Sequence, residues 1–304
     1  MEVRADETDL AEFLAKYPDA SKRLEQRNAR IKCVCKLSRP VDRQSGKSET
    51  KEGIFAADHG FQKLTLTFLA PQGEKPERVE TIDCVGVKTA FRLSRNLDSV
   101  DRKYEVEGVG SNVRESAAFG HRFGRYLTAP YSVYGMPFSV IMKGAGFRVI
   151  SAEKVDSNGR RLLRLKYNAG DPRTPYLASL LFDPAAGWII RSGEMQMESL
   201  PGHPTSRFEI EYGADHEGIP FQSRVVFHDI DGIDKKCDFS HISSEPTPVN
   251  EFSMSSYGLP DLTAFPIAST RGNWLYWLIG IAIMAFVLSV IAKKVADRLA
   301  RRAV

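Results

Sequence analysis

The stretch LLFDPAAGWIIRSGEMQM, residues 180–197, contains the clearest β-hairpin signal in the chain. Two runs rich in Leu, Ile, Phe and Met flank the short segment DPAAG, in which proline and glycine are typical of a tight turn. Aromatic and β-branched residues on either side favour extended strands. We therefore predict an antiparallel pair of strands joined by a turn at residues 183–187.

The same alternation recurs on both sides of this hairpin. In ARIKCVCKLSR, residues Ile31, Cys33, Cys35 and Leu37 fall on one face of a strand. Similar runs, among them FQKLTLTFLA, RRLLRLKYN and IPFQSRVVFHDI, are separated by turn-rich pieces such as RQSGKSET and PQGEKPE. The pattern predicts an antiparallel sheet of about eleven strands joined by hairpins.

Helical segments accompany the predicted strands. An apolar stripe through Phe13 and Tyr17 predicts a first helix that ends at Pro18, and a short second helix follows from Ser21. Between about residues 111 and 146 the strand pattern is interrupted by aromatic residues at helical spacing. The sequence thus predicts an α+β fold with a large curved antiparallel sheet, open as an incomplete barrel, an N-terminal helix and a mid-chain helical insert.

The insert carries the candidate ligand-binding residues. If the sheet curls, the insert closes its mouth and leaves an apolar cavity, which suits an apolar ligand. The same side chains could equally form a solid core. The candidates are Phe119, Phe123, Tyr126, Leu127, Phe138, Ile141 and Met142.

Residues 274–292 form a run of 19 residues without a charged side chain. As a helix rising ~1.5 Å per residue the run would be ~28 Å long, close to the ~30 Å hydrocarbon core of a bilayer. Trp274 and Trp277 stand at one end, where aromatic rings favour the headgroup level. We therefore predict that a domain at 1–250 leads through a linker at 251–272 to one transmembrane helix at 273–292.

The basic tail at 293–304 orients this anchor. It contains five Lys or Arg residues and one acid, and short basic flanks stay on the cytoplasmic side. We therefore expect a protein of the cytoplasmic membrane with its domain in the periplasm and its C-terminus in the cytoplasm. The tail's net charge of +4 equals that of the whole chain, so the rest is neutral. That balance disfavours nucleic acid as a partner, whereas the tail favours anionic membrane lipid.

An exported domain requires an export signal, and the opening stretch MEVRADETDLAEFLAKYPDA contains no apolar h-region. We expect either a natural start further upstream or a signal that has been removed. The alternative is a tail-anchored protein whose domain stays in the cytosol. That topology would send five basic residues across the membrane, which the orientation rule disfavours.

The sequence contains no constellation typical of catalysis. It lacks a GxSxG elbow, a phosphate loop, a dinucleotide fingerprint and an HExxH motif, and its six histidines are scattered. We therefore expect neither an enzyme nor a bound cofactor.

The cysteines are Cys33, Cys35, Cys84 and Cys237. Cys-x-Cys on a strand places two thiols on one face, where a soft metal such as copper could bind. The flanking Ile and Leu favour core-facing thiols instead, because cysteine buries well as a small apolar residue. In an oxidising compartment we expect at least one disulfide, with its connectivity left open.

The order of the predicted elements resembles that of the LolA-like superfamily of periplasmic carriers and sensors. The likeness covers about residues 8–254 and includes the hairpin LLFDPAAGWIIRSGEM, which is similar to the family's turn around a Leu-Asp-Pro-like step. The resemblance implies that the concave face binds an acyl chain, with the insert around residues 119–142 as its lid. It also implies that an arginine holds the lid closed, and several arginines here fit that role.

The soluble carriers of this family must move between membranes, whereas a tethered chain cannot. The predicted anchor therefore favours a receptor, sensor or assembly factor. We expect a non-catalytic, single-pass envelope protein that binds a lipid, acyl chain or lipoprotein in a half-barrel cavity, with an envelope protein as a further possible partner. The alternative is an anchored structural or protein-interaction module with a filled core and no small ligand.

Overall fold

A computed structural model describes residues 7–40, 48–58, 60–70, 76–86, 90–110, 123–157, 159–170, 174–216 and 218–260. The chain divides into two compact units, Met1–Leu259 and Pro260–Val304, and the fold below is that of the first. Among the described residues no helix is both long and apolar enough to cross a membrane. The predicted transmembrane helix at 273–292 and the basic tail at 293–304 lie outside them.

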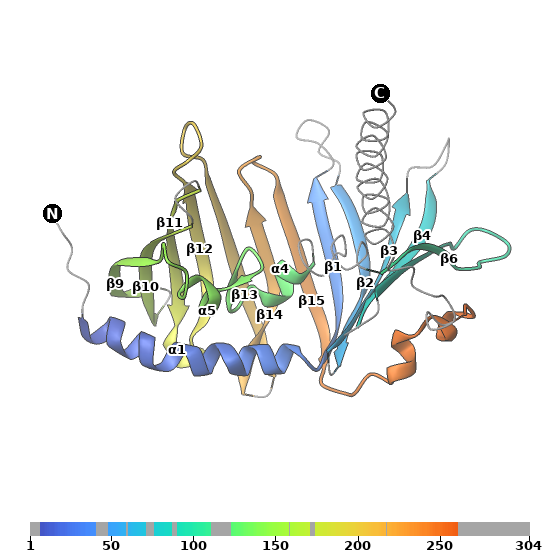
Figure 1. The fold of residues 1–304 in the computed structure, drawn as a ribbon, viewed down its shortest axis with the longest axis horizontal. Helices are drawn as coiled ribbons and strands as arrows, with labels where there is room; N and C mark the ends of the chain where they lie inside the picture. The colour runs from blue at the N-terminus through green and yellow to red at the C-terminus, as the bar shows by residue number, and fades with distance from the viewer. Residues whose placement is uncertain are drawn as a thin grey trace, which may run out of the picture. The chain divides into compact units, whose positions relative to one another are not determined.

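Within the described residues, thirteen strands form one antiparallel sheet (Figure 1). One meander runs from β1 to β6 and another from β9 to β15, and the two join where β1 pairs with β15. The strands are β1 (Ile31–Pro40), β2 (Ser48–Asp58), β3 (Phe61–Ala70), β4 (Glu77–Val85), β5 (Ala90–Asn96), β6 (Glu105–Val109), β9 (Arg148–Ser157), β10 (Arg160–Ala169), β11 (Tyr176–Asp183), β12 (Ile189–Met197), β13 (Thr205–His216), β14 (Ile219–His228) and β15 (Asp234–Ser243).

The sheet is open, because β6 and β9 stand at its two ends and do not pair with each other in the described part of the chain. The predicted α+β fold with a large, unclosed antiparallel sheet is confirmed. The sheet has thirteen strands, two more than expected, since every alternating run in the described sequence has become a strand.

The hairpin at residues 180–197 forms as predicted. Strands β11 and β12 pair from Tyr176 opposite Met197 to Asp183 opposite Ile189. The turn is a short 3-10 helix, η1 (Pro184–Ala186), capped by Gly187 with a φ of 78°, a left-handed value that glycine adopts without strain.

The first helix differs from its prediction. Helix α1 (Glu7–Asn28) is continuous and contains Pro18 in its interior, whereas the sequence predicted a break there. An interior proline costs a helix about 3 kcal/mol. Phe13 and Leu24, on either side of Pro18, are both fully buried. Burial of each such side chain is worth about 1.5–3 kcal/mol, so packing on the sheet outweighs the local preference.

The described part of the insert consists of α4 (Gly124–Thr128), the short pair β7 (Ser132–Val133) and β8 (Met136–Pro137), and α5 (Phe138–Ile141). Helices α1, α4 and α5 contribute to one hydrophobic core with the sheet and lie on the same side of it (Figure 1). We call this side the inner face of the sheet and the opposite side the outer face.

Aromatic rings fill the inner face near β10 and β11. The Phe13 ring centroid lies 4.8 Å from that of Phe182, and the Phe138 centroid lies 5.2 Å from that of Tyr167. Tyr17 completes the cluster, and all five side chains have no exposed area. This end of the inner face is therefore solid core.

The outer face of β3–β5 is covered by the segment that follows the last strand. Two 3-10 helices, η2 (Val249–Phe252) and η3 (Met254–Tyr257), lie along it. The Phe252 ring centroid is 5.4 Å from that of Phe61, and Glu251 forms an ion pair with Lys63. The first nine residues of the expected linker, 251–259, thus belong to the folded unit.

All four thiols are buried and free, so the expected disulfide is absent and that prediction is wrong. A disulfide requires Cβ atoms ~3.5–4.5 Å apart. Cys237 is aligned with Leu37 rather than with Cys35, and Cys84 is on the outer face, because its neighbour Asp83 faces inward. The described residues contain no group of three or more His, Cys, Asp or Glu side chains that could hold a metal ion.

We expect the four thiols of the native protein to resist alkylation. Burial raises the pKa of Cys35 and of Cys84 to about 12. At about pH 8 roughly one such thiol in 10⁴ is ionised, and only the thiolate reacts. Iodoacetamide should therefore modify no cysteine in buffer and all four in urea, as counted by intact mass. A cysteine that is labelled rapidly without urea would contradict this placement.

Candidate functional site

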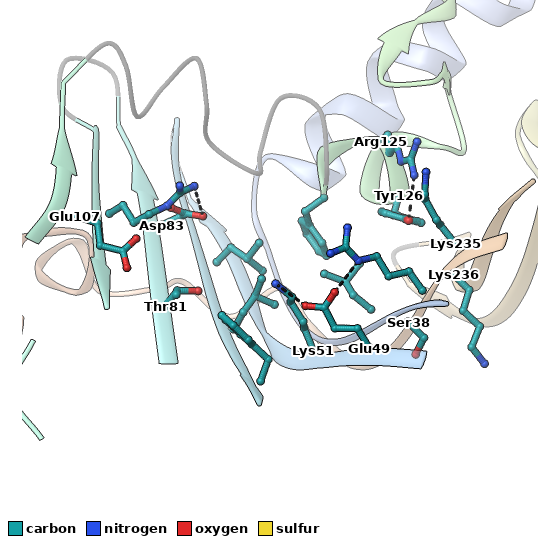
Figure 2. A pocket seen from close by; sticks show the side chains of 17 residues that line it. Ser38, Glu49, Lys51, Thr81, Asp83, Glu107, Arg125, Tyr126, Lys235 and Lys236 are labelled. Atoms are coloured by element: carbon teal, nitrogen blue, oxygen red, sulfur yellow. Dashed lines mark hydrogen bonds and ion pairs between the residues drawn. The ribbon is translucent and has the colours of Figure 1, made fainter. Parts of the chain in front are cut away.

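A cleft of about 420 Å³ opens on the inner face of the sheet where α4 meets strands β1–β6 and β15 (Figure 2). Its volume lies within the range of about 300–1,000 Å³ that is typical of small-molecule pockets. The inner face is therefore solid at one end and hollow at the other.

The floor of the cleft is apolar. Along β3 the apolar residues recur at every second position, which places them on the inner face. The floor residues are Leu37, Leu64, Leu66, Phe68, Phe123 and Tyr126. Leu37 and Phe68 are only half-buried, so apolar surface remains open to the cleft.

A glycine keeps the neighbouring strand close to this floor. Gly53 on β2 lies opposite Leu66 on β3, on the inner face. A Cβ atom at Gly53 would lie 1.9 Å from the carbonyl oxygen of Thr65 and 2.9 Å from Cδ2 of Leu66. Any side chain here would push the two strands apart, so the close pairing requires glycine.

Charged side chains form the rim above the floor. Glu49 Oε2 accepts a hydrogen bond from Arg39 Nε at 2.6 Å, and its Oε1 lies 3.2 Å from Lys51 Nζ. Burial opposes ionisation of Glu49, but the hydrogen bonds and charges of both cations together outweigh it and lower the pKa of that carboxyl. Lys51 Nζ also lies 3.9 Å from the centroid of the Phe68 ring, in cation–π contact.

A second ion pair stands on the β4–β5 side of the rim. Arg92 donates from Nε to Asp83 Oδ1 at 2.6 Å and from Nη2 to Oδ2 at 3.1 Å. Asp83 is 4% exposed, and its hydrogen bonds raise the pKa of Arg92 above its ordinary value. Of the three carboxylates among the described lining residues, Glu49 and Asp83 are thus paired with cations.

Arg125 joins the insert to the sheet. Its Nη1 lies 3.6 Å from an oxygen of Asp229, just after β14, and its Nη2 donates to the Tyr126 hydroxyl at 3.3 Å. The guanidinium also lies 4.5 Å from the ring centroid of Phe227 on β14. Burial raises the pKa of Tyr126, so this hydroxyl stays protonated beside the cleft.

The candidates from the sequence are divided between cleft and core. Phe123 and Tyr126 line the cleft. Leu127, Phe138 and Ile141 are buried in the core and are not among the lining residues, Met142 is half-buried against the same core, and Phe119 lies outside the described residues.

The charged rim was missed by the sequence reasoning. A signal was present, since Arg39, Lys51 and Asp83 occupy positions whose alternation assigns them to the same face as apolar neighbours. A charged side chain at a strand position that faces the core indicates either a buried ion pair or a cleft with polar walls.

No protein family and no curated protein matches the sequence. Among solved structures, the chain is similar to a LolA superfamily protein from Nitrosomonas europaea at 9% identity and a TM-score of 0.42, over 78% of this chain and 98% of that one. It is also similar to a DUF1329 family protein from Desulfovibrio piger at 9% identity and a TM-score of 0.40, over 80% and 98% of the two chains. Both likenesses concern the fold, at 9% sequence identity.

Proposed function

We propose that this chain is a non-catalytic binding protein that takes the apolar part of a lipid, an acyl chain or a lipoprotein into the cleft of its inner face. The hollow at β1–β6 supports this proposal, because its floor is apolar while the rest of the same face is filled with aromatic rings. A filled interaction module would need no such hollow.

The chemistry of the rim supports binding without catalysis. A general acid or base works best when its pKa lies near the operating pH. The pKa of Glu49 is instead lowered by its two cations, and Asp83 accepts two hydrogen bonds from one edge of the Arg92 guanidinium. These carboxylates serve the structure of the rim.

The proposal includes the anchor inferred from the sequence. A helix at 273–292 would hold the protein in the cytoplasmic membrane, with the cleft in the periplasm and the basic tail in the cytoplasm. The 19 uncharged residues and the five basic residues after them support this topology. A tethered binding protein presents its ligand to a membrane or an envelope protein nearby.

Filling the cleft should abolish binding. Thr81 lines the cleft from β4, opposite Leu66 on β3, so Thr81→Trp places a large ring in the hollow without emptying the core. Trp is well tolerated in strands. We expect the full-length protein to carry one monopalmitoylglycerol in native mass spectrometry, and Thr81→Trp to weaken this binding by about tenfold or more.

The matched control is Thr67→Trp. Thr67 lies next to Leu66 on β3 and faces the other side of the sheet, so the same ring is added outside the cleft. It should leave binding within about twofold of the unmodified chain. If the unmodified chain takes up no lipid, or if Thr81→Trp binds it equally well, the interaction module becomes the working hypothesis, and its partner would be sought by cross-linking.

A further inference from the structure

The charges that line the cleft are unevenly distributed. The lining residues include six Lys or Arg side chains and three acids. On the side of β4–β6, Arg92 stands with Asp83 and Glu107. At the other end, formed by β1, β2, β15 and α4, Glu49 is the one acid among the described lining residues, beside five cations: Arg39, Lys51, Arg125, Lys235 and Lys236.

Figure 2 shows this polarity directly. Glu107 and Asp83 lie at one end of the view, whereas Arg125 and Lys235 lie at the other with Lys51 between the two ends. Lys236 points away from the other cations. The cleft thus has an acidic end, an apolar floor and a cationic end.

Some of these cations form ion pairs with acids that do not line the cleft. Lys235 Nζ lies 2.6 Å from Asp229, which also faces Arg125, and 3.3 Å from Asp231, and neither acid is among the lining residues. These acids hold Arg125 and Lys235 in fixed positions at the edge of the hollow. A lysine has three N–H donors and a guanidinium five, so these contacts do not use all of them.

Charge and apolar surface meet at Lys51. Its ammonium group lies over the ring of Phe68, a floor residue, and its side chain is 28% exposed. Arg39, from the adjacent strand, is 58% exposed and shares Glu49 with Lys51. An anionic group held by these two cations would place an attached alkyl chain along Leu66 and Phe68.

We propose that the ligand is an amphiphile with an anionic head, a carboxylate or a phosphate carried on an acyl chain. The head is bound by Lys51 and Arg39 in competition with Glu49, and the chain lies on the apolar floor. This inference rests on the proposed function and adds the charge of the head group. The inference is supported by the charge complementarity between the cationic end of the cleft and an anionic head group.

The test compares four probes on the full-length protein: palmitate, monopalmitoyl phosphatidate, neutral monopalmitoylglycerol and inorganic phosphate. We expect the two anionic amphiphiles to bind at least about tenfold more tightly than the neutral lipid, because hydrogen bonds between a cation and an anionic head are stronger than those to a neutral head. Inorganic phosphate should not displace palmitate at equal concentration, because it lacks the chain.

Two variants test the residues. Lys51→Gln should weaken palmitate binding about tenfold and leave the neutral lipid within about twofold. Glu49→Gln removes the competing acid and should tighten palmitate binding several-fold. A gain of affinity cannot result from misfolding, so Glu49→Gln keeps the proposal testable even if Lys51→Gln is less stable.

The control is the pair Lys36 and Glu52, which joins the same two strands at 2.8 Å on the outer face. Glu52→Gln should change no affinity. Equal binding of charged and neutral lipids, or no gain in Glu49→Gln, would overturn the charge selection and leave the apolar cleft intact. Displacement of palmitate by phosphate at equal concentration would indicate a plain anion site. Failure of all three lipids to bind would overturn the proposed function as well.

Discussion

Replacing Phe138 with alanine is expected to lower the free energy of unfolding by about 3–5 kcal/mol, the range observed when a buried Phe is truncated. Phe138 begins α5 and has no exposed area. Its ring centroid lies 5.2 Å from that of Tyr167 and 5.6 Å from those of Tyr17 and Phe182. The cavity left behind would be walled by rigid rings from three elements, which limits its collapse. Urea denaturation of the full-length chain, followed by circular dichroism, measures the loss.

The control for this variant lies on the same helix. Val140 is 54% exposed, so Val140→Ala should change the free energy of unfolding by less than about 0.5 kcal/mol. The two variants also decide between core and ligand site for Phe138. If Phe138→Ala were nearly as stable as the unmodified chain but lost lipid binding, the hollow would extend under α5, and the role predicted from the sequence would hold.

Replacing Asp183 with alanine should cost a similar amount, about 3–5 kcal/mol, because it leaves a partly buried cation without its partner. Asp183 is 2% exposed, and its Oδ2 accepts from Arg191 Nη2 at 2.7 Å and from Nε at 3.1 Å. Its Oδ1 accepts from the N–H of Ala186 at 3.2 Å, which holds the turn of the β11–β12 hairpin. The same denaturation experiment, at constant pH, measures this effect.

Arg160 Nη1 also lies 3.3 Å from Asp183 Oδ2, but its side chain is 58% exposed, so two comparisons test the buried pair with Arg191. Asp98→Ala removes the partner of Arg78 at an exposed site, where the side chains are 40% and 58% accessible, and should lower the stability far less than Asp183→Ala, because water screens exposed charges. Adding Arg191→Met to Asp183→Ala removes the orphaned charge and should restore part of the lost stability. A loss below about 1 kcal/mol for Asp183→Ala would show that water solvates Arg191 in the folded state, contrary to its 16% exposure.

Local patterns in the sequence determined the strands. Side chains on a strand alternate between faces, so Ile31, Cys33 and Cys35 could be assigned to one face before any partner was known, and the structure buries all three. The turn at 183–187 was equally local, because proline and glycine restrict or permit backbone angles by themselves. The apolar run at 274–292 and its basic flank are likewise properties of the sequence alone.

Long-range packing decided the rest. Helix α1 continues through Pro18 because residues on both sides of it pack on the sheet, which no local rule reports. Phe123 and Phe138 both have apolar aromatic side chains in one insert, yet the first lines a cleft and the second is enclosed by rings from α1, β10 and β11. Which neighbours cover a residue depends on the register and order of strands far apart in the chain. Alternation alone therefore predicted an inward-facing set of residues, and only the tertiary structure divided that set into solid core and charged-rimmed cleft.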